Sequence, residues 1–167
     1  MNDVQELVDY LAKHELKLAT AESCTAGKII DLLGSCPGSG SYLDAGYVVY
    51  SPEAKTRLLG VTPETIEQYG LTSEEVSSAM AEGALRDSEA SVALATTGVA
   101  GPEPMDDIPP GTVCFAWGFR INGDIKVYTE TRRFEGERSD VISNAALYAL
   151  DRIPTIHSNM TEGEANP

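Results

Sequence analysis

The apolar positions of this chain fall into segments of helical spacing, separated by short runs of β-forming residues. In segment 3–14 the apolar side chains recur every three or four positions, which predicts an amphipathic helix packed on a sheet. Short apolar runs predict strands at 16–21, 47–50 and 91–96. The last of these is apolar enough to be a central strand covered on both faces. Helices and strands are therefore expected to alternate along the chain.

Capping residues predict where the other helices begin and end. Segment 24–33 is expected to be a helix that stops at Gly34. Ser51 and Pro52 predict a helix start, because serine caps free N–H groups and proline gives up a donor that has no partner there. Further helices are expected from Pro52 to Gly60, from Thr62 onward, after a cap at Thr72 or Ser73, and at 137–150.

The carboxy-terminal third predicts a β-hairpin and then a tail. Segments 112–121 and 124–134 flank Asn-Gly, which takes the positive φ angles of a two-residue turn. Interleaved helices and strands with a terminal hairpin predict a single α/β domain over residues 1–153, a three-layer α/β/α sandwich with a mixed β-sheet. Residues 154–167 contain little apolar material, so they are expected to be a disordered acidic tail.

Composition narrows the classes of partner. The 167 residues suit one globular domain, and 12 Lys and Arg against 26 Asp and Glu give a net charge of −14. That charge repels polyanions, so neither nucleic acid nor an anionic membrane is an expected partner. The first residues lack the pattern of a signal peptide and no run is apolar enough to cross a bilayer, so a cytoplasmic protein is expected.

Cysteine and histidine are too few for a metal or disulfide framework. The three cysteines cannot all pair with one another, and they show no Cys-x-x-Cys spacing. Only two histidines accompany them. We therefore expect no disulfide scaffold, no structural zinc, no catalytic metal and no cofactor.

Ser23 is the strongest candidate for chemistry, at a predicted junction of strand and helix. Its hydroxyl would stand among the free N–H groups of a first helical turn, where a developing oxyanion is stabilised. The alternative is a plain N-cap, the more common role of a lone serine. Lys55 falls in the first turn of its own helix, and partial burial there would release its proton near neutral pH, so it could act as a base. Its alternative is a solvated surface lysine near Glu53.

Two further segments add polar groups at the carboxyl ends of predicted strands, where such folds place their sites. Segment 97–102, Thr-Gly-Val-Ala-Gly-Pro, would let backbone N–H groups face an anion, although a turn of this kind is usually only a turn. It lacks the P-loop pattern, so hydrolysis of nucleoside triphosphates is not supported. Tyr50 is expected either to relay a proton or to pack in the sheet.

Arg138 lies near the start of the last predicted helix, where the helix dipole disfavours a cation. A bound phosphate would explain a guanidinium at this place. The alternative is a surface ion pair with Glu135 or Asp140.

Seven groups of motifs follow one another in a fixed order. They are Ala-Glu-Ser-Cys-Thr-Ala-Gly at 21–27; Gly46 with Tyr-Ser-Pro-Glu-Ala-Lys at 50–55; Leu-Gly-Val at 59–61; Ser-Glu-Glu-Val at 73–76 with Met-Ala-Glu-Gly at 80–83; Thr-Gly-Val-Ala-Gly-Pro at 97–102; Gly-Thr-Val at 111–113; and Phe-Glu-Gly-Glu-Arg at 134–138. Together they resemble the carboxy-terminal domain of the competence/damage-inducible CinA proteins, from about residue 4 to residue 152. The chain is similar to a stand-alone member, without the molybdopterin-binding-like domain that precedes it in full-length relatives.

The resemblance implies an activity. The family includes nicotinamide-nucleotide amidohydrolases, which convert nicotinamide mononucleotide and water to nicotinic acid mononucleotide and ammonia in pyridine nucleotide salvage. It implies Ser23 as nucleophile, Lys55 as base, Tyr50 as a third polar member of the site, and Thr97 and Arg138 as substrate-binding residues. The other implied substrate-binding positions are Cys24, Thr25, Gly27, Gly46, Gly98, Ala100 and Gly101, with the N–H groups around Cys24 and Thr25 as the oxyanion hole. No metal is required, the substrate is a pyridine mononucleotide, and a homo-oligomer is expected.

Two departures from the family pattern bear on function. Ala26 replaces a glycine, a small change, whereas segment 103–107, Glu-Pro-Met-Asp-Asp, replaces further glycines with stiffer and more acidic residues. Its charge would weaken the binding of a phosphate unless the side chains point away. A non-catalytic ligand-binding or partner-binding module is therefore the alternative to an amidohydrolase, and another small amide is an alternative substrate.

Overall fold

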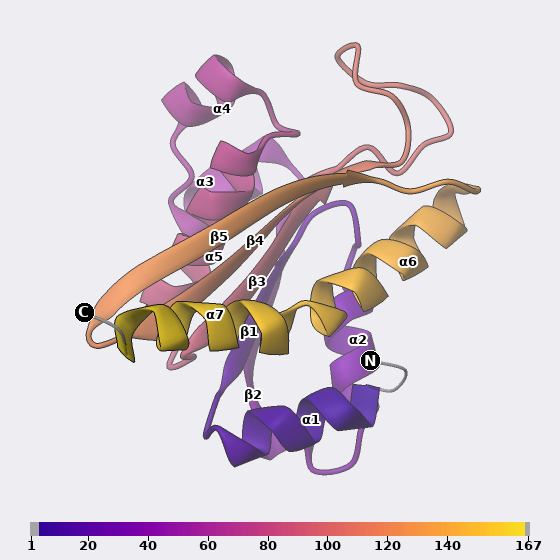
Figure 1. Cartoon of the computed structure of the whole chain (residues 1–167). Coiled ribbons are helices and arrows are strands. Elements are labelled where there is room, and N and C mark those ends of the chain that lie inside the picture. The colour runs from indigo at the N-terminus through magenta and orange to yellow at the C-terminus, as the bar shows by residue number, and fades with distance from the viewer. Residues whose placement is uncertain (1–3, 166–167) are drawn as a thin grey trace.

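Five strands form one mixed sheet in the computed structural model, which describes residues 4–165. Their order across the sheet is β2-β1-β3-β4-β5, and Figure 1 shows them as one twisted layer between two groups of helices. The strands are β1 (Leu18–Glu22), β2 (Leu43–Val48), β3 (Val92–Gly98), β4 (Thr112–Ile121) and β5 (Asp124–Arg133). The predicted hairpin is confirmed, since β4 pairs antiparallel with β5 across Asn122 and Gly123.

Strand β1 is the centre of the parallel half of the sheet. It pairs in parallel with β2 on one side and with β3 on the other, and all five of its residues are buried. Glu22 lies opposite both Val48 and Thr96, so the three strands end at the same edge of the sheet. The segments that follow these strands therefore meet in space, as the carboxyl ends of parallel strands do in open α/β sheets.

Helices cover both faces of the sheet, which confirms the three-layer α/β/α sandwich (Figure 1). One face carries α1 (Val4–Lys13), α2 (Lys28–Gly34), α6 (Arg138–Asp151) and α7 (Ile153–Ala165), and the other carries α3 (Pro52–Leu59), α4 (Pro63–Tyr69) and α5 (Glu74–Asp87), with a short 3₁₀ turn at Ser39–Ser41. None of the helices in the described part of the chain is both long and apolar enough to span a bilayer.

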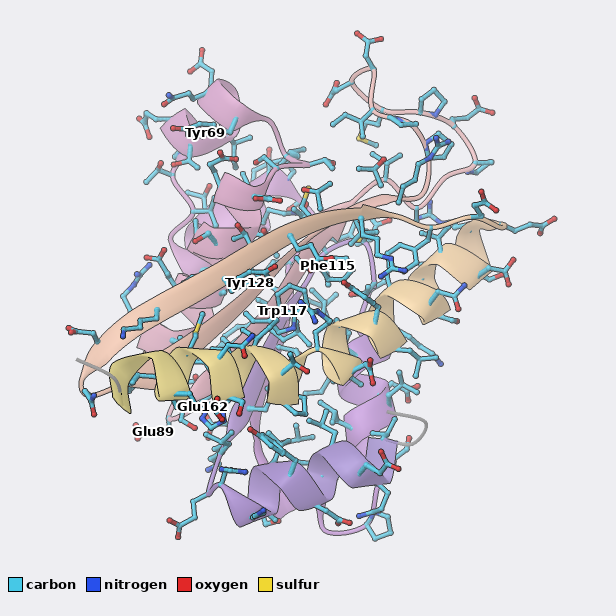
Figure 2. All side chains as sticks on the ribbon, viewed as in Figure 1. Tyr69, Glu89, Phe115, Trp117, Tyr128 and Glu162 are labelled. Atoms are coloured by element: carbon cyan, nitrogen blue, oxygen red, sulfur yellow. The ribbon has the colours of Figure 1, made fainter. Side chains whose placement is uncertain are left out.

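The two faces of the sheet are packed differently. Large aromatic side chains fill the face under α6 and α7, where the rings of Phe115 and Trp117 stack with centroids 5.4 Å apart (Figure 2). The indole of Trp117 donates to the carbonyl of Ala149 on α6 at 2.8 Å. The opposite face is lined by small alanines, which bring α5 close to the sheet. Helix α5 also touches α3 closely, since a Cβ at Gly83 would lie 2.0 Å from the Leu59 carbonyl oxygen.

The predicted helix caps are present. Ser51 accepts from the Ala54 N–H at 3.1 Å, and Ser73 accepts from the Val76 N–H at 3.2 Å. Thr62 caps α4 in the same way, and Gly60 ends α3 in the left-handed conformation. These signals are local, so the sequence alone predicts them well.

Two elements, β2 and α2, begin four residues away from their predicted starts. Strand β2 occupies 43–48 rather than 47–50, because it is an edge strand whose exposure alternates and which therefore lacks a continuous apolar run. Helix α2 begins at Lys28 rather than at residue 24, because Ala26 and Gly27 have φ angles of 51° and 93° that interrupt a right-handed helix. Residues 23–27 form a turn instead.

The expectation of a disordered tail is wrong for residues 154–165, which belong to helix α7. Its few apolar residues fall on one face, where Ile153 and Ile156 are buried and Met160 is half-buried. The imidazole of His157 packs on Phe119, with ring centroids 5.5 Å apart. Pro154 fits the first helical turn, where its missing N–H has no partner to lose. The last two residues of the predicted tail lie outside the described residues.

We expect Ile156→Ala to lower the free energy of unfolding by about 2–4 kcal/mol, because it opens a cavity in a packed core. Ile156 is 3% exposed, whereas its neighbour Thr155 is exposed and serves as the control. Thr155→Ala should change stability by less than about 0.5 kcal/mol. Urea denaturation measures both, and equal stabilities of the two variants would show that α7 does not pack on the domain.

Candidate functional site

The side chains of Ser23 and Lys55 meet where β1 ends. Ser23 follows β1 directly and is 7% exposed, and Lys55 on α3 is 1% exposed. The Lys55 amine Nζ lies 2.9 Å from the Ser23 hydroxyl oxygen. Nζ also donates to the carbonyls of Val49 at 2.8 Å and Tyr50 at 3.1 Å. The alternative of a solvated surface lysine is therefore wrong.

This arrangement suits a neutral amine as well as an ammonium. A neutral lysine amine has two N–H bonds and one lone pair, and the two carbonyls accept both N–H bonds. The lone pair is then left for the third neighbour, the hydroxyl of Ser23. Burial lowers the pKa of Lys55 from 10.5 to about 8, because the charged form loses solvation, and the nearby Cys24 thiol opposes this shift weakly. Lys55 can therefore accept the proton of Ser23 near neutral pH.

Ser23 is not a helix cap, so both the N-cap alternative and the placement of its hydroxyl in a first helical turn are wrong. Helix α2 begins five residues later, after Gly27. The turn from Ser23 to Gly27 is closed by a bond from the Ala26 N–H to the Ser23 carbonyl at 3.1 Å. Within residues 4–165, the N–H groups of Cys24 and Thr25 donate to no backbone carbonyl. Two amides next to the hydroxyl are thus free of backbone partners.

Glu22 is a site residue that the sequence reasoning missed. It is fully buried, and its carboxylate supplies the cap that the start of α2 lacks: it accepts from the N–H groups of Ile29 at 2.9 Å and Ile30 at 3.1 Å. It also accepts from the Thr25 hydroxyl at 2.7 Å. An acidic residue at the end of an otherwise uncharged strand was the available signal, since a buried carboxylate needs partners.

A cavity of about 500 Å³ opens at this edge of the sheet. Nine of the predicted site residues line it: Ser23, Cys24, Tyr50, Lys55, Thr97, Gly98, Ala100, Gly101 and Arg138. Three predicted substrate-binding residues, Thr25, Gly27 and Gly46, do not line it. The strand ends therefore bring together the segments at 23–24, 50–55 and 97–101, as expected.

The three residues outside the cavity have structural contacts instead. Thr25 is committed to Glu22, and Gly27 stands before α2 with a positive φ. Gly46 lies on β2 opposite Thr20, where a Cβ would come 2.9 Å from the Ile30 side chain. The strand needs glycine there because α2 packs so closely on it.

Arg138 connects the two walls of the cavity. Its guanidinium donates to the Gly101 carbonyl at 2.6 Å and to the Tyr50 hydroxyl at 2.8 Å. In the described part of the chain it forms no ion pair with Glu135 or Asp140, and Asp140 instead accepts from the Glu137 N–H at 2.9 Å. Tyr50 is 56% exposed and lies beyond β2, so the alternative of packing in the sheet is wrong.

Thr97 lines the cavity, but its hydroxyl already has a partner. It donates to the Leu71 carbonyl at 2.8 Å and is buried. Leu71 lines the same cavity. Thr97 therefore holds the segment before α5 against the end of β3.

The acidic segment after Pro102 divides into two parts. Glu103, Pro104 and Met105 line the cavity. Asp106 and Asp107 form the tip of a small hairpin, closed by two backbone hydrogen bonds between residues 105 and 108, and they do not line it. Figure 1 shows the connection between β3 and β4 projecting from the sheet. Of the three acidic residues in this segment, only Glu103 thus lines the cavity.

A second cavity of about 800 Å³ lies beyond Arg138. It shares Ala100, Gly101, Pro102 and Arg138 with the first cavity, and Arg133 lines its far part. The two cavities therefore adjoin at Arg138.

Neither a metal cluster nor a cysteine nucleophile is supported by the geometry. Among residues 4–165, no group of three or more His, Cys, Asp or Glu side chains is placed to hold a metal ion. The Cys24 thiol next to Ser23 is buried, which raises its pKa to about 12. A thiol of such high pKa is a poor nucleophile, because the thiolate is the reactive form.

Comparisons with known proteins show the family and agree with the fold. Residues 2–156 match the CinA C-terminal domain. The nicotinamide-nucleotide amidohydrolase PncC of Pseudomonas putida is 42% identical over 146 residues, which cover 87% of this chain and 89% of that protein. A CinA-like protein of Mycobacterium marinum is 44% identical over 150 residues, 89% of this chain but 34% of that protein. The chain thus spans about a third of the length of several relatives.

Solved structures show the same fold. A CinA superfamily protein of Escherichia coli superposes with a TM-score of 0.86 at 36% identity, over 92% of this chain and 87% of that one. The competence/damage-inducible protein CihA of Agrobacterium tumefaciens gives a TM-score of 0.82 at 33% identity, over 94% and 97%.

The lowered pKa of Lys55 predicts a pH-dependent stability. Between the folded pKa of about 8 and the ordinary lysine pKa of 10.5, the unfolded chain binds more protons than the folded one, so stability rises with pH. Relative to Lys55→Met, the wild type should gain on the order of 2 kcal/mol across this window. Urea denaturation of both proteins from pH 7 to 10.5 measures the difference. A constant difference would mean that Lys55 keeps its ordinary pKa.

Proposed function

The chain belongs to the CinA C-terminal domain family, and on that premise we propose that it hydrolyses the carboxamide of nicotinamide mononucleotide to nicotinic acid mononucleotide and ammonia. One observation carries the proposal: the Lys55 amine lies 2.9 Å from the Ser23 hydroxyl in a buried pair at the wall of a cavity. The name of the P. putida relative supports the choice of substrate. The reaction would serve pyridine nucleotide salvage.

The first half of the reaction makes an acyl-enzyme. Neutral Lys55 takes the proton of the Ser23 hydroxyl as its oxygen attacks the carboxamide carbon. The carbonyl oxygen becomes an oxyanion, which the N–H groups of Cys24 and Thr25 can stabilise because no backbone carbonyl accepts from them within residues 4–165. Protonated Lys55 then gives its proton to the amide nitrogen, and ammonia leaves as the C–N bond breaks.

The second half regenerates the serine. A water molecule attacks the ester carbonyl while Lys55 takes one of its protons. The proton returns to the Ser23 oxygen as the ester bond breaks, and the carboxylic acid leaves. Each step uses side chains and backbone groups of this chain.

Arg138 and the second cavity support a nucleotide rather than free nicotinamide as substrate. The guanidinium has five N–H donors, and Gly101 and Tyr50 accept two of them. The remaining donors can bind a phosphate, which suits a planar guanidinium. The second cavity of about 800 Å³ gives room for the ribose phosphate beyond the carboxamide.

A ligand-binding module without turnover is the second candidate, and Glu103 favours it. Glu103 lines the same cavity as Arg138. A carboxylate near the site weakens the binding of an anionic ligand by electrostatic repulsion, and added salt reduces this effect. Retention of the buried Ser23–Lys55 pair favours the enzyme.

We expect purified protein without added metal to release ammonia and nicotinic acid mononucleotide in equal amounts from nicotinamide mononucleotide. Ser23→Ala should lower kcat by at least about 10³-fold, because it removes the nucleophile. The exposed Ser35 at the end of α2 offers a matched control, and Ser35→Ala should keep full activity. Liquid chromatography of nicotinic acid mononucleotide and an ammonia assay measure the products formed by both variants.

The variant Lys55→Arg distinguishes two roles of Lys55: a base that accepts a proton, and a fixed positive charge that only holds the substrate. Arginine stays protonated, so turnover should fall as far as in Ser23→Ala. In the wild type, kcat/KM should rise through about pH 8 as Lys55 loses its proton. Appreciable turnover by Lys55→Arg would remove the role of Lys55 as base, and a wild type without product would favour the binding module.

The acidic segment predicts a salt-dependent affinity. Glu103→Gln should lower KM for nicotinamide mononucleotide about two- to threefold at low ionic strength, and less at 0.5 M salt. Asp107 sits at the hairpin tip outside the cavity, so Asp107→Asn is the control and should change KM less. Equal effects of the two variants would mean that the Glu103 carboxylate points away from the substrate.

A further inference from the structure

The carboxylate of Glu22 stands behind the site, on the central strand of the sheet. It is fully buried between β2 and β3, both of which pair with β1 at this residue. Oε1 accepts from the Thr25 hydroxyl at 2.7 Å and from the Ile29 N–H at 2.9 Å, and Oε2 accepts from the Ile30 N–H at 3.1 Å. Glu22 does not line the cavity, so it does not touch the substrate.

These hydrogen bonds determine which hydroxyl group is the donor in the neighbouring contact between Thr25 and Thr96. Thr25 has one hydroxyl proton, and it goes to Glu22. In the 2.8 Å contact between Thr25 and Thr96, Thr96 must therefore be the donor. The chain from Thr96 through Thr25 to Glu22 ties β3 to the turn at 23–27 and ends on a carboxylate.

The same residue also reaches the other half of the catalytic pair. The backbone carbonyl of Glu22 accepts from the Val49 N–H at 2.9 Å. Val49 in turn offers its carbonyl to Lys55 at 2.8 Å. The side chain of Glu22 thus holds the turn that begins at Ser23, and its backbone holds the segment that orients Lys55.

From this double contact we propose that Glu22 is a positioning residue, which fixes the Ser23 hydroxyl and the amides of Cys24 and Thr25 against Lys55. The expected effect on kcat rests on the proposed hydrolysis. The proposal that Glu22 holds the turn at 23–27 does not depend on the substrate. A displacement of about 1 Å in such a site costs about 10²-fold in rate.

Glutamine tests the need for two accepting oxygens at nearly constant volume. With its amide oxygen in place of Oε1, its NH₂ group faces the Ile30 N–H; in the other orientation, NH₂ faces the Ile29 N–H. In both orientations the glutamine NH₂ group faces a backbone N–H with no acceptor between them, so the turn must shift. Thr25→Val is the milder variant: it removes only the hydroxyl arm and leaves both N–H bonds of α2 in place.

Tyr42→Phe is the matched control. The Tyr42 hydroxyl is buried and donates to the Leu33 carbonyl at 3.0 Å, at the opposite end of α2. Glu22→Gln and Tyr42→Phe therefore both remove a buried hydrogen bond of the same helix. Only the first touches the turn that carries Ser23.

The test measures kcat and KM for nicotinamide mononucleotide, with amide hydrogen exchange of residues 23–30 followed by mass spectrometry. We expect Glu22→Gln to lower kcat about 10- to 100-fold, with KM within about threefold of wild type. Thr25→Val should lower kcat by a smaller factor in the same direction, and it serves alone if Glu22→Gln does not fold. Tyr42→Phe should keep wild-type kcat. Exchange in segment 23–30 should rise at least tenfold in Glu22→Gln and by a smaller factor in Thr25→Val, and it should stay unchanged in Tyr42→Phe.

Two results overturn the proposal. One is a kcat of Glu22→Gln, or of Thr25→Val if it serves alone, no lower than that of Tyr42→Phe; the other is unchanged exchange in segment 23–30. If the wild type itself forms no product, the proposed function fails, and hydrogen exchange alone decides whether Glu22 holds the turn. The two failures are thereby distinguishable.

Discussion

The burial of one lysine organises this site. Lys55 gives up nearly all contact with water, and in exchange its amine lies within hydrogen-bond distance of Ser23, Val49 and Tyr50. A charged amine in such surroundings is poorly solvated, so its pKa falls toward neutrality. The contacts come from three segments, after β1, after β2 and on α3, and each must be placed accurately for the amine to reach a hydroxyl. The parallel pairing of β1 with β2 and β3 is what brings them together.

Local signals in the sequence predicted much of this structure, because they act over a few residues. Helix caps at Ser51 and Ser73 and the Asn-Gly turn were confirmed, since each depends on its immediate neighbours. The ends of strands in an α/β fold indicated that Ser23, Tyr50 and Thr97 lie at one edge of the sheet. Lys55 as the base for Ser23 was implied by the resemblance to the CinA family, and the two side chains do meet. The spacing of residues in the sequence could not show which strands are adjacent in the sheet.

The errors have a common cause in tertiary contacts. Glu22 caps α2 from the preceding strand, so no capping residue appears next to the helix, and its start was predicted too early. Helix α7 has too few apolar residues to fold alone, but Ile153 and Ile156 find a core that the rest of the chain provides. Gly46 does not line the cavity, and its role is to let α2 pack closely on β2.

Tyr50 stands between Lys55 and Arg138, which are the base and the anion-binding residue of the proposed function. Its backbone carbonyl accepts from Lys55, and its hydroxyl accepts from Arg138, so the length of one tyrosine side chain separates the two cations. An anion beside Lys55 would raise the pKa of the amine and keep it protonated. Arg138 lines the second cavity as well as the first, so under the proposed function a phosphate in the second cavity would lie at a distance from the carboxamide beside Ser23. In a chain with a net charge of −14, this division would, under the proposed function, let an anionic substrate be held without raising the pKa of the base that acts on it.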